Sequence, residues 1–435
     1  MSLLKDSKRD SGFEYPEFVN AVRNMEGATK SVTALGGDIT FLSYCNIPEL
    51  EEPGKTLMYV YNSENLEAFQ KGGKLPVGRI NNADFGEELL EEMKKTTELM
   101  VIINGEKYLV SDIAIPTMTI RADVGGSMTI MYQNMIRNMH FADTIIAKKE
   151  QIMFIYREEE ITTPTGPVTV KKIFGCLSKD YRKMPQSVLI DAIGKIDDGV
   201  MGKYRCREWS VDHKFTDIYL DFPEAAEDFQ KEFGMPDKYT PGLFLCTSDI
   251  GASSVIARGC YRIGNSYLIT DEVAFKHSKK TTIDEIVEAI DSGVFTNMRK
   301  LPETMSKLIG IECKQPKEMI TFVANKCLKG KNLIPATRAK ELAEVICFEI
   351  DDSRTYTLYD IAKIFLQIGE MTLPVTEKGE DGKKKKTGKV IGLYDGIDSV
   401  RVTAIQKALN EVPLFLEKNA DKEFSKPRKI VILPD

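Results

Sequence analysis

Residues 152–269 alternate strand-like runs with turns, and this pattern limits the fold more than any other feature of the chain. The runs are rich in β-branched and aromatic residues and cover 153–156, 168–174, 215–220, 243–246, 255–257 and 267–270. One helix is predicted among them, over 186–196. The runs are irregularly spaced, and none leads through a glycine-rich turn into a helix. The pattern therefore argues against a doubly wound nucleotide-binding fold and predicts a mixed or antiparallel β-rich core.

Helical periodicity flanks this core on both sides. The first third mixes helices predicted over 17–29 and 86–98 with short strands predicted over 57–61, 100–103, 117–120 and 128–132. From residue 281 the pattern is helical, and Thr282 with Glu285 has the spacing of a capping box. The predicted fold class is α+β, with a mixed or antiparallel β-rich central region and a helical C-terminal segment.

Three regions follow from these patterns. Residues 1–110 form an acidic α+β region, 111–280 the β-rich core and 281–435 a mainly helical region. Within the last region, 377–389 (EKGEDGKKKKTGK) has no apolar residue to bury, which predicts a mobile lysine-rich loop. It is not a phosphate-binding loop, because the two glycines are one residue too far apart and Val390 stands where a hydroxyl is required.

Composition predicts a cytoplasmic protein. No run approaches the roughly 20 apolar residues of a membrane-spanning helix, and the N-terminus has no apolar signal segment. The 8 cysteines form no C-x-x-C pair, which is typical of reduced thiols packed as small hydrophobes. We expect no membrane contact.

The net charge of −6 is unevenly distributed along the chain. Residues 1–110 hold 12 basic and 18 acidic residues, which accounts for the whole excess. Residues 171–214 hold 10 basic and 6 acidic residues, and 296–332 hold 8 basic and 3 acidic residues. A polyanion would therefore be bound by a focused patch in one of these two segments.

Candidate metal and catalytic groups are sparse. The three histidines, His140, His213 and His277, are isolated from one another. Asp212 and Asp217 near His213 could suit Mg²⁺, but carboxylates at the start of a strand more often face solvent. There is no G-x-S-x-G elbow around a serine. We assign no metal, no cofactor and no catalytic residue, and we leave open whether the protein is an enzyme.

Two segments combine positive charge with aromatic rings, the pairing that binds single-stranded nucleic acid. The first contains Tyr181, Arg182 and Lys183. In the second, strand alternation places Arg205, Arg207 and Trp209 on one face, next to Tyr204. The alternative is a half-buried strand whose aromatic rings pack inward and whose arginines neutralise nearby carboxylates.

Two blocks resemble a family borne by bacteriophages and plasmids, the domain of unknown function 932. The segment 175–185 (GCLSKDYRKMP) is similar to the family's LS-x-x-Y turn, and 241–251 (PGLFLCTSDIG), followed by 253–262 and His277, is similar to its second signature. The order of Cys260 and Arg262 departs from that signature. The resemblance covers about residues 100–370. It implies a phage context, and with it the cytoplasm of a bacterial host or the virion, but no biochemical role.

The second block also has a local physical meaning. Pro241 and Gly242 would start a strand, 248–251 is a turn in which Gly251 adopts positive φ, and 253–262 would return as the partner strand. The turn and its surroundings could form a polar site, or they could only stabilise a turn. The residues of this candidate site are Ser248, Asp249, Arg258, Arg262 and His277.

These observations predict a bacteriophage-encoded accessory protein that binds single-stranded DNA or RNA through the two basic and aromatic segments. The alternative is a virion-associated or host-takeover protein that acts as a homo-oligomer without catalysis, suggested by the methionine-rich stretch at 128–139. An enzyme built on the candidate polar site is the third hypothesis.

Overall fold

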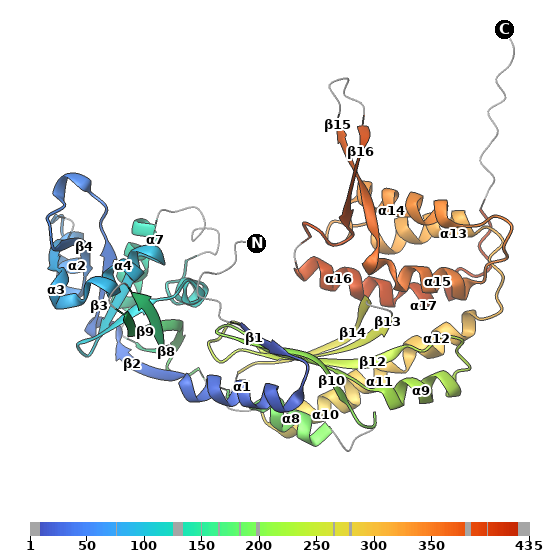
Figure 1. The fold of residues 1–435 in the computed structure, drawn as a ribbon, viewed down its shortest axis with the longest axis horizontal. Coiled ribbons are helices and arrows are strands. Elements are labelled where there is room, and N and C mark those ends of the chain that lie inside the picture. Colours follow the sequence, from blue (N-terminus) through green and yellow to red (C-terminus); the bar gives the residue numbers. More distant parts are fainter. Residues whose placement is uncertain are drawn as a thin grey trace, which may run out of the picture.

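The protein has an α+β fold built on two large sheets. The structure is a computed structural model that describes residues 9–74, 76–124, 134–148, 150–163, 166–181, 184–196, 201–263, 266–277, 281–378, 384–397 and 399–424. Figure 1 shows an open arc, in which the eight-stranded sheet lies at one end and the C-terminal helices at the other, with the six-stranded sheet between them.

The eight-stranded sheet forms the first unit together with its helices. In spatial order its strands are β2 (Lys30–Leu35), β8 (Gln151–Thr163), β9 (Gly166–Ser178), β7 (Glu106–Val110), β6 (Leu99–Ile103), β3 (Ile39–Tyr44), β4 (Lys55–Tyr61) and β5 (Val77–Asn81). The pairs are antiparallel except β7 with β9, which is parallel. The helices are α2 (Ser63–Gln70), α3 (Asn82–Phe85), α4 (Glu87–Lys95), α5 (Ile115–Arg121) and α7 (Asn134–Ala147), with short turns η1 (Gly36–Asp38), η2 (Pro48–Leu50) and η3 (Asp112–Ala114).

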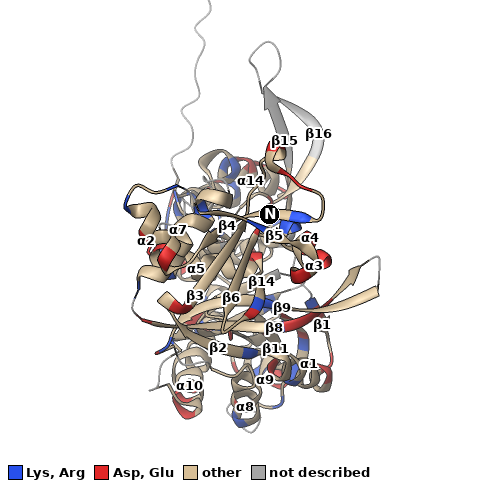
Figure 2. Ribbon diagram, turned by 90° about the vertical axis from the view of Figure 1, so that its left-hand side faces the viewer, with Lys and Arg blue, Asp and Glu red and all other residues tan. Residues whose placement is uncertain are grey.

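Both faces of this sheet are buried by helices. On one face Met118 of α5 and Phe141 of α7 pack into the larger core of the unit. On the other face Leu90 and Met93 of α4 cover a smaller core. Acidic positions are prominent on α2 and α3 in Figure 2, in keeping with the acidic composition of the first 110 residues.

The six-stranded sheet is antiparallel throughout. Its strands in order are β1 (Arg9–Gly12), β10 (Arg205–Asp212), β11 (Thr216–Asp221), β12 (Thr240–Thr247), β13 (Val255–Ile263) and β14 (Ser266–Phe275). Its helices are α1 (Tyr15–Ala28), α8 (Val188–Ile196), α9 (Pro223–Glu232), α10 (Ile283–Ala289), α11 (Thr296–Met298) and α12 (Lys300–Leu308), with the π-helical turn η4 (Ile290–Phe295) between α10 and α11.

Alternation along these strands separates a core face from a polar face. Ile218, Leu220 and Leu243 are fully buried in the main core, which Phe18 of α1 and Phe295 of η4 also enter. Helices α8–α12 lie below the sheet in Figure 1. The residues between the buried positions therefore point to the upper side, which the arc leaves open.

The C-terminal helices lie above the β13–β14 end of this sheet in Figure 1. They are α13 (Pro316–Val323), η5 (Ala324–Leu328), α14 (Ala336–Glu349), α15 (Leu358–Leu366), η6 (Ile368–Glu370), α16 (Ser399–Asn410) and α17 (Val412–Lys418). A hairpin of β15 (Thr372–Lys378) and β16 (Lys384–Gly392) projects from them. Their apolar faces continue the main core.

Local sequence signals place several of these elements. The capping box predicted at α10 is confirmed, since the Thr282 side chain accepts from the Glu285 amide and the Glu285 side chain accepts from the Thr282 amide. The predicted hairpin at 241–262 is also confirmed as β12 and β13. Gly251 in its turn has φ +81°, a conformation that a residue with a Cβ rarely adopts.

The sheets do not follow the three regions read from the sequence. The boundary at 110 falls at the end of β7, whose parallel neighbour in the same sheet is β9, 56 residues further along the chain. Strand β1, from the acidic N-terminal region, instead pairs with β10 in the other sheet. In both sheets, therefore, a strand from before that boundary pairs with a strand from after it.

Two local predictions were wrong. Residues 117–120 lie in helix α5 rather than in a strand, and Pro116 occupies the first turn of that helix, where its missing N–H costs nothing. At both ends of the lysine-rich stretch 377–389 the chain is not an irregular loop, because Glu377 pairs with Lys385 and Lys378 with Lys384 in the β15–β16 hairpin, whereas residues 379–383 lie outside the described residues. Strand pairing satisfies backbone groups there without needing apolar side chains.

The methionine-rich stretch lies partly in α7. Met135 and Met139 pack against the core of the first unit, with Asn138 fully buried between them. Residues 128–133 lie outside the described residues. No helix in the described part of the chain is both long and apolar enough to cross a membrane.

Candidate functional site

A groove runs over the polar face of the six-stranded sheet. It consists of two adjoining cavities of about 790 and 440 Å³ that share Phe13 and Glu208. Strands β10 and β11 contribute to both cavities, and the segment from β1 into α1 forms one rim. Phe13 on this rim is 70% exposed, which is unusual for a phenylalanine side chain.

Three half-buried aromatic rings, Tyr219, Phe244 and Tyr267, lie together on this face, and we call them the aromatic floor. Tyr219 of β11 stands directly opposite Phe244 of β12, with ring centroids 4.4 Å apart. The ring centroid of Tyr267 of β14 lies 5.4 Å from that of Tyr219. Tyr219 and Phe244 line the smaller cavity. The floor is therefore a continuous patch of rings within a sheet.

Arginine side chains surround the aromatic floor. Arg207 Nε donates to Tyr267 Oη at 3.1 Å. The Arg258 guanidinium lies 5.5 Å from the centroid of the Phe244 ring and pairs with Glu272. Arg262 Nε lies 3.2 Å from Asp221 Oδ2. Arg205 is exposed beside them. Hydrogen bonds and ring contacts thus hold most of these guanidinium groups in position.

A β-bulge decides which β10 side chains reach the groove. Cys206 pairs with Leu220 but Glu208 pairs with Tyr219, so Arg207 is an extra residue without its own partner on β11. After the bulge Trp209 pairs with Ile218, on the core face. The predicted alternation of Arg205, Arg207 and Trp209 on one face is therefore wrong.

Trp209 belongs to the main core. Its side chain is 5% exposed, and its ring lies 6.0 Å from Phe18 of α1. Trp209 also lines the smaller cavity, but a side chain that is 5% exposed offers little ring surface to an external base. Arg205, Arg207 and Tyr204, three residues of the predicted basic and aromatic segment, do line the larger cavity. Tyr204 packs edge-on against Tyr15 at 5.6 Å.

The groove carries both signs of charge. Its walls hold five basic residues and four acidic ones: Arg9, Arg205, Arg207, Lys238 and Arg262, and Glu14, Glu208, Asp217 and Asp221. Burial raises the pKa of Asp221, although Arg262 and Arg207 lower it. Burial also raises the pKa of Asp217, while a hydrogen bond from Ser210 lowers it. Both carboxyl groups are therefore less acidic than in water.

The five residues of the candidate polar site do not converge. Ser248 is fully buried and Asp249 is 1% exposed, at the junction between the two sheets. Arg258 and Arg262 lie instead on the polar face of β13, where Arg258 pairs with Glu272 of the adjacent β14 and Arg262 with Asp221 of β11, two strands away. The prediction of one polar site is wrong, because the turn is folded into the protein and the strand carries its arginines away from it.

Asp249 is held by a residue that sequence reasoning missed. Arg157 of β8 is 1% exposed, and its Nη2 donates to both Asp249 carboxylate oxygens, at 2.9 and 3.0 Å. Its Nη1 donates to the His213 carbonyl at 3.0 Å, and its Nε to Thr29 Oγ1 at 3.0 Å. In the sequence, this role was indicated only by a single arginine at the end of an apolar strand-like run.

His277 and Tyr181 form a second contact near this junction. Tyr181 Oη lies 2.5 Å from His277 Nδ1. Burial lowers the pKa of His277, while the nearby Asp249 raises it. Tyr181 also packs against the small cluster of Ile250 and Leu177. Tyr181 is therefore a packing residue here and is not part of the groove, and Arg182 and Lys183 lie outside the described residues.

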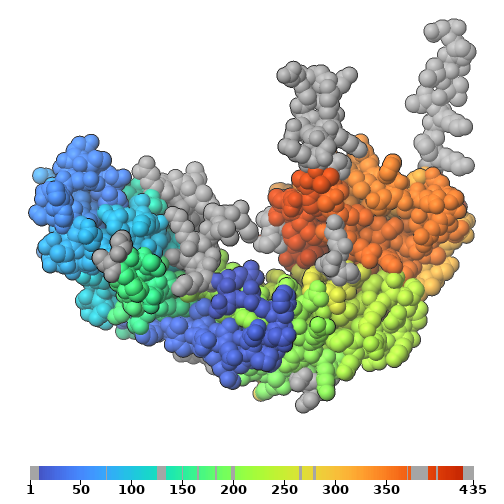
Figure 3. Space-filling model, in the orientation of Figure 1, coloured from blue at the N-terminus to red at the C-terminus, as the bar shows by residue number. Residues whose placement is uncertain are grey.

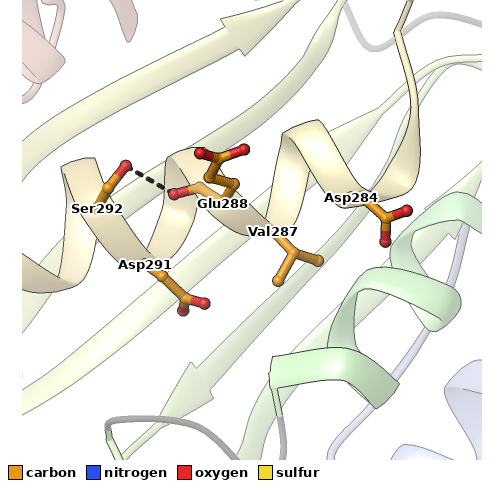
Figure 4. A pocket seen from close by; sticks show the side chains of 5 residues that line it. All are labelled: Asp284, Val287, Glu288, Asp291 and Ser292. Carbon is orange, nitrogen blue, oxygen red and sulfur yellow. Dashed lines mark hydrogen bonds between the residues drawn. The ribbon is translucent and has the colours of Figure 1, made fainter.

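Another cavity lies along helix α10 and η4. Figure 4 shows its lining side chains, Asp284, Val287, Glu288, Asp291 and Ser292, all from one helical stretch. Ser292 Oγ donates to the Glu288 carbonyl at 2.7 Å, and Asp284 pairs with Lys195. Within the described ranges, no three histidine, cysteine or carboxylate side chains are grouped as metal ligands.

Comparison with known proteins adds no identity. No protein-family model matches this chain, and no match exists among curated proteins or solved structures. The resemblance to the domain of unknown function 932, and with it the bacteriophage origin, stays a prediction from the sequence. The function must therefore be inferred from the groove itself.

Proposed function

We propose that the protein binds single-stranded nucleic acid in the groove of the six-stranded sheet. The observation that carries the proposal is the aromatic floor with arginines around it. An exposed sheet face with rings at its centre is a recurrent platform for unpaired bases, because every base has a flat apolar face that can stack.

Stacking requires rings that are accessible and fixed. Tyr219 and Phe244 are half-buried and line the cavity, so each keeps an open surface while its strand holds it in place. Burial raises the pKa of Tyr267 to about 12, so its hydroxyl stays protonated and neutral at physiological pH. Phe13 on the rim supplies a fourth ring that could cover a bound base.

Phosphate binding requires cations that are not fully neutralised. Arg205 is exposed at the mouth of the larger cavity. Arg207 donates from Nε to a neutral tyrosine hydroxyl, and among the described residues its charge is shared only with the nearby carboxyl group of Asp221, whose pKa it lowers. These two arginines are therefore the phosphate contacts in this proposal, as the sequence suggested.

The test is the salt dependence of binding. A labelled single strand of about 12 nucleotides, DNA or RNA, is titrated with the protein and followed by fluorescence polarisation. The variant R205Q/R207Q removes two phosphate contacts. It should lower the slope of log affinity against log salt by about 1.4, since each contact with a single strand contributes about 0.7.

The control is K71Q/K340Q, which removes two exposed lysine charges from helices far from the groove. Its slope should equal that of the wild type. Absence of any binding at low salt, or an unchanged slope in R205Q/R207Q, would contradict the proposal. An unfolding curve for each variant establishes that the variant is folded, so that a lower salt slope is not caused by unfolding.

A further inference from the structure

We infer that the smaller cavity of the groove selects guanine among the bases of a bound strand, through Asp217 and Arg9. This inference rests on the proposed function, and it names the base that the groove prefers. The cavity adjoins the aromatic floor and has a volume of about 440 Å³. This volume lies within the roughly 300–1,000 Å³ that is usual for small-molecule sites, so the cavity has room for a single base.

The two rings that line this cavity stand in a row of side chains that crosses the sheet. Direct cross-strand pairs join Glu208 to Tyr219, Tyr219 to Phe244, Phe244 to Arg258 and Arg258 to Glu272. Side chains that stand directly opposite one another on adjacent strands lie on the same face of a sheet. A base that stacks on Tyr219 or Phe244 therefore lies over β11 and β12.

Asp217 lies next to this row on the same face. It precedes Tyr219 by two residues in β11, which is roughly 7 Å along a strand and is comparable with the length of one base. Its neighbours in the chain, Thr216 and Ile218, are fully buried on the other face, whereas Asp217 lines the smaller cavity. A base stacked on the Tyr219 ring can therefore turn one edge toward the Asp217 carboxylate.

The Asp217 carboxylate has acceptor capacity that the protein does not use. Ser210 is 2% exposed and donates from Oγ to Asp217 Oδ2 at 2.8 Å, which fixes the orientation of the carboxylate. No other described residue donates a hydrogen bond to Asp217 or forms an ion pair with it. Asp221, in the same groove, is instead held by Arg262. Because Asp217 is half-buried, a ligand group that donates to it is bound more strongly than at an exposed carboxylate.

Arg9 supplies the opposite chemistry at the rim of the same cavity. It is an exposed residue of β1, the edge strand of the six-stranded sheet. Figure 3 shows the N-terminal segment that contains β1, in dark blue, at the base of the hollow between the two ends of the arc. Burial raises the pKa of Asp217 and the charge of Arg9 lowers it, so Arg9 lies close enough to act on this carboxylate. The cavity therefore offers acceptors and forked donors side by side.

Guanine is the base whose edges match both groups. Its Watson–Crick edge presents two adjacent donors, N1–H and N2–H, which one carboxylate can accept together. Its O6 and N7 are acceptors that suit a guanidinium. Adenine and cytosine each present one amino donor beside an acceptor, and thymine presents one donor between two carbonyl oxygens. A base other than guanine would therefore leave part of the Asp217 carboxylate unpaired, which lowers its affinity.

The experiment compares strands that differ only at their centre. Each is a thymidine strand of about 12 nucleotides whose two central bases are guanine, hypoxanthine, adenine, cytosine or thymine, and binding is followed by fluorescence polarisation at one salt concentration. The wild type should bind the guanine strand at least about fivefold more tightly than the thymine strand, the lower end of what one bidentate contact gives. Hypoxanthine keeps N1–H but lacks the N2 amino group, so its strand should bind with intermediate affinity.

The variant Asp217→Asn tests the carboxylate. For a strand without guanine, the loss of a negative charge should tighten binding, whereas the guanine strand also loses an acceptor. The ratio of the guanine and thymine affinities should therefore fall to within about twofold. Arg9→Lys keeps the positive charge but not the forked donors, and it should also lower this ratio. An inactive fraction of protein reduces both affinities equally, so partial unfolding does not change the ratio.

The matched control is Glu208→Gln, which removes a carboxylate that lines the same cavity but is exposed to solvent. It should keep the guanine preference of the wild type. Loss of the preference in Glu208→Gln, or an unchanged preference in Asp217→Asn, overturns the role of Asp217. An unchanged preference in Arg9→Lys overturns the role of Arg9.

The failure of the proposed function looks different. In that case the wild type binds none of the strands at low salt. If the wild type binds all of them equally, or binds the adenine or cytosine strand more tightly than the guanine strand, the proposed function stands and only the guanine inference fails.

Discussion

Arg157 and Asp249 form a buried ion pair that joins the two sheets of the protein. Arg157 lies in β8 of the eight-stranded sheet and Asp249 in the turn between β12 and β13 of the six-stranded sheet. Both side chains are 1% exposed, and one guanidinium nitrogen donates to both carboxylate oxygens. The Phe174 ring lies 5.0 Å from the guanidinium and stacks on His213 at 4.4 Å. This pair fixes how the sheets meet.

Breaking the pair should destabilise the protein strongly. We expect Arg157→Met to cost about 3–5 kcal/mol in the free energy of unfolding, because it leaves the Asp249 carboxylate buried without its partner. The double variant R157M/D249L should lose at least about 1 kcal/mol less than the sum of the two single variants. Urea unfolding of the four proteins measures this coupling, and simple additivity would rule out a direct interaction.

His277 should make stability fall on mild acidification. Its pKa is lowered from 6.5 by burial, so the unfolded chain takes up the proton first as the pH falls. Neutral His277 contributes its full stability at pH values above the pKa of histidine in the unfolded chain. This contribution is lost as the pH falls from that pKa to the lower pKa of His277 in the folded protein.

His277→Gln does not titrate and should lack this loss, while its amide can still bond Tyr181. Unfolding free energies at about pH 7.5 and about pH 5.5 give the comparison. The difference in unfolding free energy between the wild type and the variant should be smaller at the lower pH. A difference that is the same at both pH values would show that His277 keeps its ordinary pKa in the folded protein.

Tyr219 should matter for binding and Trp209 should not. Tyr219→Leu removes a ring of the aromatic floor and should weaken single-strand binding by about 1–3 kcal/mol, the usual worth of one stacked base. Trp209→Phe keeps an aromatic ring in the main core and should leave the affinity unchanged at a modest cost in stability. Polarisation titrations with both folded variants decide this, and the reverse ranking would place the bound strand elsewhere.

Asp217→Asn should both stabilise the protein and tighten binding. Burial raises the pKa of Asp217 above 3.8, so the folded protein is penalised when this carboxyl group is ionised. The penalty is present above the folded pKa and disappears as the pH falls toward 3.8. Asparagine keeps an oxygen that can accept from Ser210 Oγ, which lies 2.8 Å from Asp217 Oδ2.

At neutral pH the Asp217→Asn variant should therefore unfold at higher urea, and it should bind the single strand more tightly because one negative charge leaves the groove. Asp38→Asn, an exposed change in the first unit, is the control and should have neither effect. Lower stability of Asp217→Asn at neutral pH would mean that the ionised carboxylate is favoured in the fold.

Sequence patterns determined the features that depend on neighbours along the chain. The capping box at Thr282, the β12–β13 hairpin and the positive φ of Gly251 each follow from a few consecutive residues, because caps and turns are made by local hydrogen bonds and local sterics. The α+β class follows from the same local preferences, summed over the chain. Two of the groove arginines, Arg205 and Arg207, were found through their charge and position.

Only the tertiary structure decided which elements lie side by side and which side chains share a face. The bulge at Arg207 moved Trp209 into the core, and a bulge depends on how two strands register rather than on either strand alone. Asp249 pairs with Arg157, which lies 92 residues earlier in the chain. Tyr219, Phe244 and Tyr267 lie together although they belong to three different strands. The sequence by itself determined the kinds of element and the charges available, because these are local properties. The groove came from long-range pairing, which no short segment encodes.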